Sequence, residues 1–351
     1  MECYLEEENR INTLFEVLEE VTTCKECFLL VPKAAIRILE SHSVETEESL
    51  QRLFDFTRSV TDDSVKVTLY TLIIKFSRER GVPYYVAKGL LQKYLIERND
   101  LKQLEESFRM GQEVLYYTKF LSREEKITFY FRMALHAKNI NKYNECIELC
   151  EVGLPLETED TELKARAYLA MINSFSHQKN YDAVEKHLDI FEKMNNDFVV
   201  ESVKITRAFT KARKKEFDTA IPLLKKYLDE VSINHKIHIA DELLEIYLQL
   251  GEFESIAEIL EKEEELLPEH PLTPQKYIAM GKFHKYKGYY QLSMGLLDEG
   301  IESYAKSLKA FGSVNALEEK DDCMKELLSY HIKLSKSLEL KHIMKLKEVY
   351  E

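Results

Sequence analysis

From about residue 66 onward, one unit recurs along this chain: a long helical segment, a short turn, a large hydrophobic residue and a second helical segment. The second segments begin at Tyr143, Tyr181, Phe217, Phe253 and Leu297, which lie 38, 36, 36 and 44 residues apart. A small or aliphatic residue follows each start within four positions: Ile147, Ala183, Ala220, Ala257 and Ile301. This spacing puts both residues on the helix face where a partner helix packs closely. A unit of this size cannot bury its apolar face alone, so successive units must stack on one another.

The period is close to that of the tetratricopeptide repeat (TPR), about 34 residues. The stretch LQLGEF at 248–253 matches the turn of that repeat, because Gly251 can take the left-handed conformation that ends a helix. The chain has no Trp, so the tryptophan of the repeat signature is absent and the units are TPR-like. Only 10 Gly and 7 Pro occur in 351 residues, which is sparse for a β-rich protein. We therefore predict an all-α fold, a right-handed TPR-like helical superhelix (solenoid) over residues 66–351.

The ends of this stack are predicted from weaker patterns. Three degenerate segments, 66–81, 84–97 and 101–118, are expected to form further helices of the stack. Pro271 and Pro274 are expected to mark the entry to the last full repeat. The terminal KHIMKLKEVYE suits a capping helix, which a solenoid needs to cover its last apolar face.

Residues 1–65 break the period and are predicted to form a separate head of four short helices. NRINTLFEVLEEV, CKECFLL, KAAIRILES behind Pro32, and EESLQRLFDFTRSV read as these helices, the last with Thr46 or Ser43 as its N-cap. Short helices with an early tight turn suit a helix-turn-helix whose recognition helix spans 33–41. Lys33 and Arg37 would then approach the DNA major groove, with Lys25 at the phosphate backbone.

The charge of this head favours a different use. Residues 1–65 hold six Lys or Arg and fifteen Asp or Glu, a net charge of −9, whereas a DNA-binding module is normally the most basic part of its chain. The net charge of the whole chain, −13, argues against broad non-specific binding to nucleic acid or to an anionic membrane. The alternative is a head that contacts a protein.

We find no pattern that indicates an enzyme. Cys24-x-x-Cys27 lacks a second Cys or His pair nearby, and Cys146 and Cys150 lie one helical turn apart, so both pairs are interpreted as helical core. With Cys3 and Cys323, the six cysteines read as reduced thiols of a cytoplasmic protein. No apolar run approaches the roughly 18–20 residues that span a bilayer, and the acidic N-terminus is unlike a secretory signal. We expect no catalytic activity, no cofactor, no metal site and no membrane partner.

Polar residues interrupt the otherwise apolar first helices and suggest a peptide-binding groove. An Asn amide can donate to and accept from one peptide bond, an Arg suits the carboxylate of a peptide, and a Glu suits its amino group. The alternative for any one of them is a partly solvated helix face. The candidates are His136, Asn139, Arg166, Asn173, Lys204, Arg207, Glu242 and His284.

With these features the chain resembles the peptide-sensing regulators of Gram-positive bacteria and their phages, the Rap, NprR, PlcR and AimR group. It is most similar to the AimR-type arbitrium receptors, which control the phage switch between lysis and lysogeny. The stretches that carry the resemblance are AIRILESHS, LQRLFDF, AKGLLQKYLIERNDLKQLEESFRMG, NINKYNECIELCEVGL and ARAYLAMINSFSHQKNYDAVEKHL. The resemblance implies a homodimer, a DNA-binding head and a short communication peptide bound inside the superhelix.

The resemblance also implies roles for single residues. In that family, asparagines near the ends of first helices hold the peptide backbone, and Asn139 and Asn173 fall where those asparagines would. An arginine holds the peptide carboxylate, but Glu162 occupies the nearest position here, so Arg166 or Lys164 would have to replace it. Glu242 falls near an acid of the family's pocket, and the acidic head departs from the family pattern.

The leading hypothesis from the sequence is therefore a peptide-responsive transcription regulator of the quorum-sensing (arbitrium) type. Peptide binding would bridge repeats and so alter the spacing of two DNA-binding heads in a dimer. The alternative is a TPR adaptor that binds a protein partner under peptide control without touching DNA.

Overall fold

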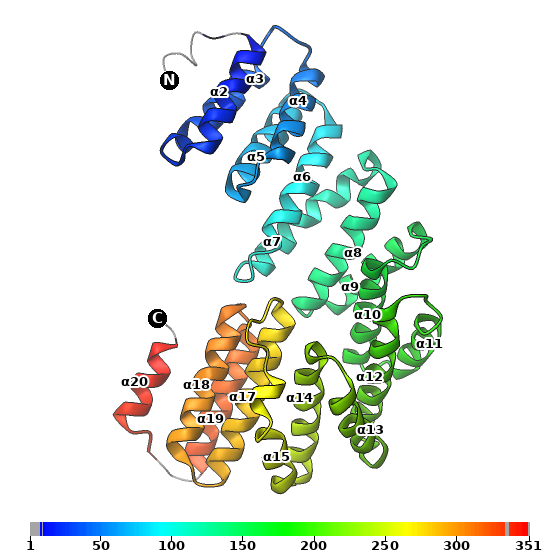
Figure 1. The fold of residues 1–351 in the computed structure, drawn as a ribbon, viewed down its shortest axis with the longest axis vertical. Coiled ribbons are helices and arrows are strands. Elements are labelled where there is room, and N and C mark those ends of the chain that lie inside the picture. The colour runs from blue at the N-terminus through cyan, green and yellow to red at the C-terminus, as the bar shows by residue number, and fades with distance from the viewer. Residues whose placement is uncertain (1–7, 9, 334–336, 350–351) are drawn as a thin grey trace. The chain divides into compact units, whose positions relative to one another are not determined.

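The computed structural model describes residue 8, residues 10–333 and residues 337–349, and these residues form helices and turns without any strand (Figure 1). The predicted all-α fold is confirmed. The N-terminal elements are α2 (Ile11–Thr23), the 3-10 helix η1 (Lys25–Leu30), α3 (Val31–Leu39), α4 (Thr46–Ser59), α5 (Asp63–Glu79), α6 (Pro83–Glu97), α7 (Leu104–Gly111) and the 3-10 helix η2 (Gln112–Phe120).

The repeats follow as helix pairs. They are α8 (Arg123–Asn139) with α9 (Tyr143–Gly153), α10 (Glu162–His177) with α11 (Tyr181–Phe191), α12 (Asp197–Arg213) with α13 (Phe217–Glu230), α14 (Ile233–Leu250) with α15 (Phe253–Leu260), and α17 (Pro274–Ser293) with α18 (Leu297–Ser313). The remaining elements are the 3-10 helix η3 (Leu154–Leu156), α16 (Glu263–Leu266), α19 (Leu317–Lys333) and α20 (Leu340–Glu348). All five second helices begin at the residues predicted from the sequence, and α17 begins at Pro274 as expected.

The same turn joins the two helices of each pair. A residue with positive φ stands two positions before the next helix in seven turns of the described chain, at Gly81, Asn141, Lys179, Lys215, Gly251, Gly295 and Asn315. The residue after it donates its backbone N–H to the carbonyl five positions earlier, as Glu252 does to Tyr247 at 3.0 Å. This is the hydrogen bond of a Schellman C-cap, which satisfies carbonyls at the helix end. Gly251 takes the left-handed conformation predicted from LQLGEF.

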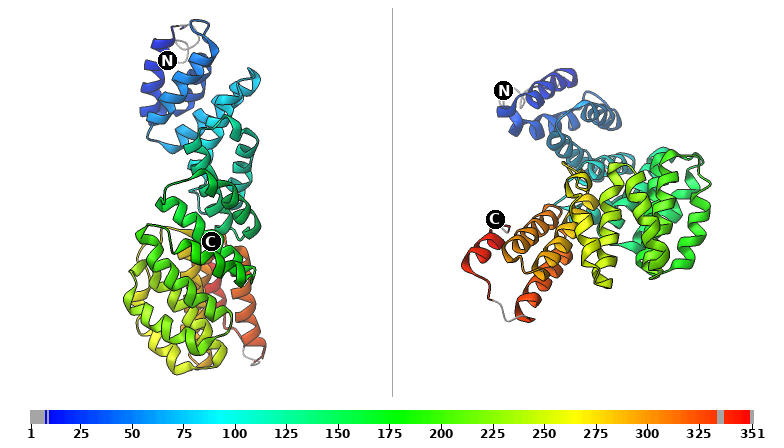
Figure 2. Two further views of the ribbon diagram at one scale, coloured as in Figure 1. Left: turned by 90° about the vertical axis from the view of Figure 1, so that its right-hand side faces the viewer. Right: turned by 60° about the horizontal axis from the view of Figure 1, so that its bottom comes forward.

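Close approach of the two helices in the last full pair depends on glycine. A Cβ on Gly281 of α17 would lie 2.4 Å from the Phe311 ring of α18, and one on Gly288 would lie 2.7 Å from the Tyr304 ring. The absence of side chains at these positions lets α17 and α18 pack along their length, with α19 beside them (Figures 1 and 2). The capping helix predicted at the C-terminus corresponds to α20, whose Leu346 joins the buried core of α18 and α19.

The described chain forms two compact units. Unit 1 comprises Met1–Asp100, Leu104–His136 and Glu151–Glu157, and unit 2 comprises Leu101–Gln103, Ala137–Cys150 and Thr158–Glu351. The predicted division was a head of residues 1–65 followed by the repeats. In unit 1, the helices of this head share one apolar core with α5 and α6, since Leu53 packs in the same cluster as Tyr70 and Tyr85.

Three local predictions were wrong. Helix α4 begins at Thr46 with Glu45 as its N-cap, so neither Thr46 nor Ser43 caps it; the Ser43 hydroxyl instead pairs with that of Ser41 at 2.7 Å. The predicted helix 101–118 is α7 followed by the tighter η2. Helix α3 begins one residue before Pro32 and ends at Leu39, because proline is tolerated in the first helical turn, where its missing N–H needs no partner.

Candidate functional site

The first helices of unit 2 bring a set of titratable side chains close to one another. We call this set the first-helix cluster: Lys138, His177, Arg213, His238, Asp241, Glu242 and Lys282. The members come from α8, α10, α12, α14 and α17, of which α10, α12, α14 and α17 pack in that order. Each is near enough to act electrostatically on others of the set, as Lys138, Arg213 and Lys282 all act on His177.

The repeat explains why these side chains meet. His177 and Arg213 are the last residues of α10 and α12, and they stand one repeat of 36 residues apart. Equivalent positions of stacked units lie side by side, so polar residues at these helix ends form one group. Arg213 Nη1 donates to the Ser176 hydroxyl at 2.5 Å, which joins the ends of α10 and α12 directly.

The surrounding protein shifts the ionisation of the cluster strongly. Burial, reinforced by Arg213 and Lys282, lowers the pKa of Lys138 to about 8. Burial, reinforced by Lys138 and other cations, lowers the pKa of His238 to about 3. Burial raises the pKa of Glu242 to about 7 against the opposing effect of Arg213. Each shift favours the neutral form of its group, as expected where charged groups are withdrawn from water without full compensation.

The cations of the cluster are poorly matched within the chain. Over the part of the chain that the structure describes, Lys138 and Lys282 form no ion pair, and Arg213 binds only neutral oxygen. Two neighbouring histidines are held neutral near pH 7, so they add no compensating or competing charge. The cluster therefore has unused capacity for an anionic group such as a carboxylate.

The structure brings three of the residues predicted from the sequence to this cluster or beside it. Glu242 belongs to it. Asn173 stands one helical turn before His177 and therefore on the same face of α10, and Asn139 directly follows Lys138 at the end of α8. Both asparagines are half-buried, so their amides remain partly accessible.

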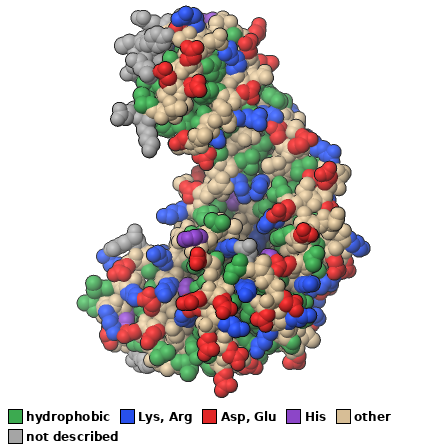
Figure 3. Space-filling model, in the orientation of Figure 1, with side chains coloured by type: hydrophobic (Ala, Val, Ile, Leu, Met, Phe, Trp, Pro, Cys, Tyr) green, Lys and Arg blue, Asp and Glu red, His purple; other side chains and the backbone are tan. Residues whose placement is uncertain are grey.

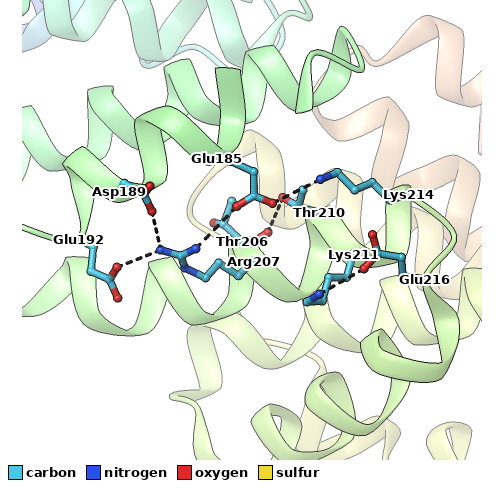
Figure 4. Close-up of polar contacts among 9 residues, drawn as sticks. All are labelled: Glu185, Asp189, Glu192, Thr206, Arg207, Thr210, Lys211, Lys214 and Glu216. Carbon is cyan, nitrogen blue, oxygen red and sulfur yellow. Dashed lines mark hydrogen bonds and ion pairs between the residues drawn. The ribbon is translucent and has the colours of Figure 1, made fainter. Parts of the chain in front are cut away.

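Arg207 is engaged elsewhere in unit 2. Its guanidinium lies 3.6 Å from Glu185, 3.1 Å from Asp189 and 2.9 Å from Glu192, all on α11 or directly after it (Figure 4). Lys214 adds a further contact to Glu185 at 3.5 Å. We call these five residues the Arg207 network. It ties α12 to α11 and leaves Arg207 little capacity for a ligand.

Arg166 and Lys204 also lie outside the cluster. Arg166 bonds Glu162 on its own helix at 2.7 Å, and its guanidinium lies 4.7 Å above the Phe198 ring. Lys204 is exposed on α12. Mixed acidic and basic side chains of this kind are spread over the face drawn in Figure 3.

The two predicted histidines are buried. His136 of α8 has both ring nitrogens engaged, Nδ1 with the Tyr94 hydroxyl at 3.2 Å and Nε2 with the Leu104 carbonyl at 2.9 Å. His284 stands two residues after Lys282, which puts it on nearly the opposite face of α17, with Nδ1 3.9 Å from Glu263. We therefore assign neither histidine to the cluster.

The head residues predicted for DNA lie on and before α3 in unit 1. Lys33 is exposed, and Arg37 donates to the backbone carbonyl of Glu8 at 3.1 Å. The side chain of Lys25 lies outside the described part of the structure. Beside Lys33 and Arg37, the apolar side chains of Leu29 and Ile36 are also exposed.

Sequence reasoning missed most of the cluster: Lys138, His177, Arg213, His238, Asp241 and Lys282. One signal could have found His177 and Arg213, because each is the last residue of its helix and they stand one repeat apart. The residues in the middle of α14 and α17 carry no such mark, since charged residues occur on every face of these helices.

The residues that the structure describes contain no group of His, Cys, Asp or Glu able to hold a metal ion. None of the helices they form is long and apolar enough to cross a bilayer.

Comparison with known proteins gives little. No known protein family and no curated protein matches the chain. Among solved structures it is similar to the crystal structure of a Rap protein complexed with competence and sporulation factor, with 12% sequence identity, 93% of this chain and 97% of that chain covered, and a TM-score of 0.45. This TM-score is too low to establish a shared fold, so what Rap binds is not carried over to this chain.

Proposed function

We propose that unit 2 is a receptor for a short peptide and that the chain is a peptide-responsive regulator. The observation that carries the proposal is the first-helix cluster, where Lys138 and Lys282 stand half-buried without an ion pair in the described chain. A peptide with a free carboxylate supplies the missing anion, and charge-assisted hydrogen bonds to it are the strong kind. Asn139 and Asn173 would hold peptide bonds, and Glu242 the amino group.

The direct test is retention of peptides by the purified chain. A pool of synthetic hexapeptides with free termini, randomised at every position, is passed over immobilised protein, and the retained peptides are identified by mass spectrometry. We expect a limited set to be retained by the wild type, weaker binding by Lys282→Met and by Asn173→Ala, and unchanged binding by Lys204→Met, whose lysine is exposed away from the cluster. Retention of no peptide by the wild type would refute the proposal.

We further propose a transcriptional output of the quorum-sensing, arbitrium type, with the head of unit 1 as the DNA-reading part. Lys33 and Arg37 would reach the DNA from the outer side of α3. Mobility shift of the DNA on either side of the chain's own gene, at low salt, tests this. No shift, or a shift that survives replacement of both Lys33 and Arg37 by Ala, would refute it.

A protein-binding head is the second candidate, and one observation favours it. Leu29 is 83% exposed and Ile36 is 40% exposed beside Lys33, in a head whose net charge is −9. Exposed apolar side chains close together are typical of protein contacts, and the negative charge repels DNA phosphates. Leu29→Ser would then abolish capture of the partner while leaving peptide binding unchanged.

A homodimer is part of the proposal, with the C-terminal helices as the contact. The outer sides of α19 and α20 expose Leu328, Ile332, Leu340 and Ile343. Sedimentation of the wild type against Ile332→Glu decides the matter: the wild type should sediment as a dimer and the variant as a monomer. A monomeric wild type would remove the dimer from the proposal.

A further inference from the structure

One member of the first-helix cluster has a buried carboxyl oxygen without a hydrogen-bond partner among the described residues. Asp241 stands in the middle of α14 and is 8% exposed, and its Oδ1 has no hydrogen-bond donor among the described residues. A buried carboxyl oxygen without a donor is costly in free energy, and native proteins satisfy nearly all such atoms. The same is true of few other side-chain atoms of unit 2, and none of those is a carboxyl oxygen among the residues described.

The groups around Asp241 compensate a negative charge on it only in part. From α17, Lys282 acts on it without forming an ion pair in the described chain, and the Tyr286 hydroxyl donates to Glu245 at 3.1 Å instead. On α14 itself, Glu242 and Glu245 add like charge.

Several charged groups on the other elements packed against α14 are engaged by partners other than Asp241. Arg213 of α12 acts on Glu242 and binds Ser176. Lys225 of α13 lies 5.6 Å over the Tyr247 ring. Glu258 of α15 pairs with Lys225 at 3.9 Å, and Glu263 of α16 pairs with Lys287.

Burial, reinforced by Glu242 and Glu245 and opposed by Lys282, raises the pKa of Asp241 well above its ordinary value, which favours its neutral, protonated form. Asp241, Glu242 and Glu245 stand within about one turn of α14, and the Oδ1 atom of Asp241 lacks a hydrogen-bond donor among the described residues. Lys138 and Arg213 of the cluster stand on other helices, whereas Lys282 of α17 acts on Asp241 and opposes the upward shift of its pKa.

We propose that Asp241 receives a cationic group of the bound ligand, a primary ammonium or a guanidinium, and releases its proton to solvent as that group arrives. The proposal rests on peptide binding by the cluster and deepens it. The carboxylic acid loses H⁺, the carboxylate so formed pairs with the cation, and the Oδ1 atom obtains its missing donor. Binding of such a ligand therefore strengthens as pH rises.

The experiment uses three matched pools of synthetic hexapeptides. The first has a free N-terminus and one lysine scanned through the six positions, the second replaces that lysine by norleucine, and the third is the norleucine pool with an acetylated N-terminus. Each pool is passed over the full-length wild type, over Asp241→Asn, and over the control Glu254→Gln, which alters an exposed acid of α15. Retention is measured at pH 6 and pH 8.

The wild type and Glu254→Gln should retain a cationic pool more strongly than its uncharged counterpart. The ratio of the two retentions should increase by up to about tenfold for each unit that pH rises. If the norleucine pool is retained less than the lysine pool, the cation that binds Asp241 is a side-chain ammonium. If retention falls only when the N-terminus is acetylated, that cation is the terminal amine. Asp241→Asn should retain peptides through Arg213 and Lys282, with a smaller preference and a weaker pH dependence than the wild type, because Glu242 remains. Equal preference in Asp241→Asn and wild type overturns the inference, whereas retention of no pool by the wild type overturns peptide binding itself.

A second measurement does not depend on the variant folding. Calorimetry of one retained peptide with the wild type, in phosphate and in Tris at one pH, gives the number of protons exchanged, because the two buffers differ in ionisation enthalpy. We expect release of about one proton per peptide. Binding with no proton released would overturn the inference even where peptides bind.

Discussion

Unit 2 holds two groups of charged side chains that differ in how their charges are compensated. In the Arg207 network, one guanidinium meets three carboxylates at 2.9 to 3.6 Å, and the side chains are 37% to 67% exposed (Figure 4). In the first-helix cluster, Lys138 and Lys282 meet no carboxylate in the described chain, and burial shifts several groups toward their neutral forms.

The difference distinguishes a structural contact from the proposed binding site. Charges matched within the chain and screened by water are worth little to stability and attract no ligand, whereas unmatched charges withdrawn from water cost stability until a partner arrives. A protein retains such a cost where a function requires it.

Removing one cation of the cluster should stabilise the protein and weaken peptide binding. The pKa of Lys138 is lowered from 10.5 to about 8, so its charge opposes folding at every pH below about 8. Lys138→Met should therefore raise the free energy of unfolding at pH 7 by about 3 kcal/mol. Loss of a charged hydrogen bond should weaken binding of a retained peptide about tenfold or more. Urea unfolding and calorimetry measure the two effects; a variant that is stabilised yet binds as tightly as the wild type would contradict the contrast.

Neutralising Glu242 should stabilise the protein only at high pH. The pKa of Glu242 is raised from 4.5 to about 7, so the folded protein loses stability as pH rises from 4.5 to about 7. Glu242→Gln should be more stable than the wild type by about 3 kcal/mol at pH 8, with the difference vanishing near pH 4.5. Asp189→Asn, from the Arg207 network, is the matched control and should not be stabilised. Parallel pH profiles for Glu242→Gln and the wild type would refute the prediction.

His238 should reduce the stability of the protein at low pH, whereas Glu242 reduces it at high pH. Its pKa is lowered from 6.5 to about 3, so stability is lost as pH falls below 6.5. At pH 5 the loss in the free energy of unfolding is about 2 kcal/mol, and His238→Gln should be more stable than the wild type by this amount. Thermal unfolding at pH 5 and pH 8 is the measurement, with exposed His270→Gln as the control. Equal losses in His238→Gln and the wild type would mean that His238 is readily protonated in the folded protein.

Breaking the Arg207 network should have the smallest effect. Arg207→Met removes three partly exposed ion pairs, for which a total loss of about 1 kcal/mol or less is expected. Affinity for a retained peptide should be unchanged, as judged by calorimetry. A tenfold loss of affinity in Arg207→Met would make Arg207 part of the binding site and remove the contrast between the two groups.

The repeat was predictable because it rests on short-range patterns. Tyr143, Tyr181, Phe217, Phe253 and Leu297 each begin a second helix, and Gly251 ends a first helix, as their spacing and chemistry indicate. The turn itself was less visible, since Asn141, Lys179, Lys215 and Asn315 take the same positive φ as the glycines. Turn position is set by where the two flanking helices must end, and this can hold a Lys in a conformation that it rarely adopts alone.

The candidate site was predictable only in part. Glu242, Asn139 and Asn173 were singled out because polar residues in apolar first helices stand out in the sequence, and they stand in or beside the first-helix cluster. His136 looked alike in sequence, yet its ring is buried between Tyr94 and Leu104. Those partners lie 42 and 32 residues away, beyond the reach of any local pattern.

The sequence by itself determined the helices, their period and the residues at which the pairs begin, since these follow from local periodicity and turn chemistry. Only the tertiary structure decided which charges are compensated. Arg207 and Arg213 stand on the same helix, but Arg207 meets carboxylates on α11 and directly after it, whereas among the described residues Arg213 donates to a hydroxyl of α10 and forms no ion pair. Asp241 and Glu242 are ordinary acids in the sequence, and their ionisation depends on burial by neighbouring helices, a property of packing that one-dimensional spacing does not contain.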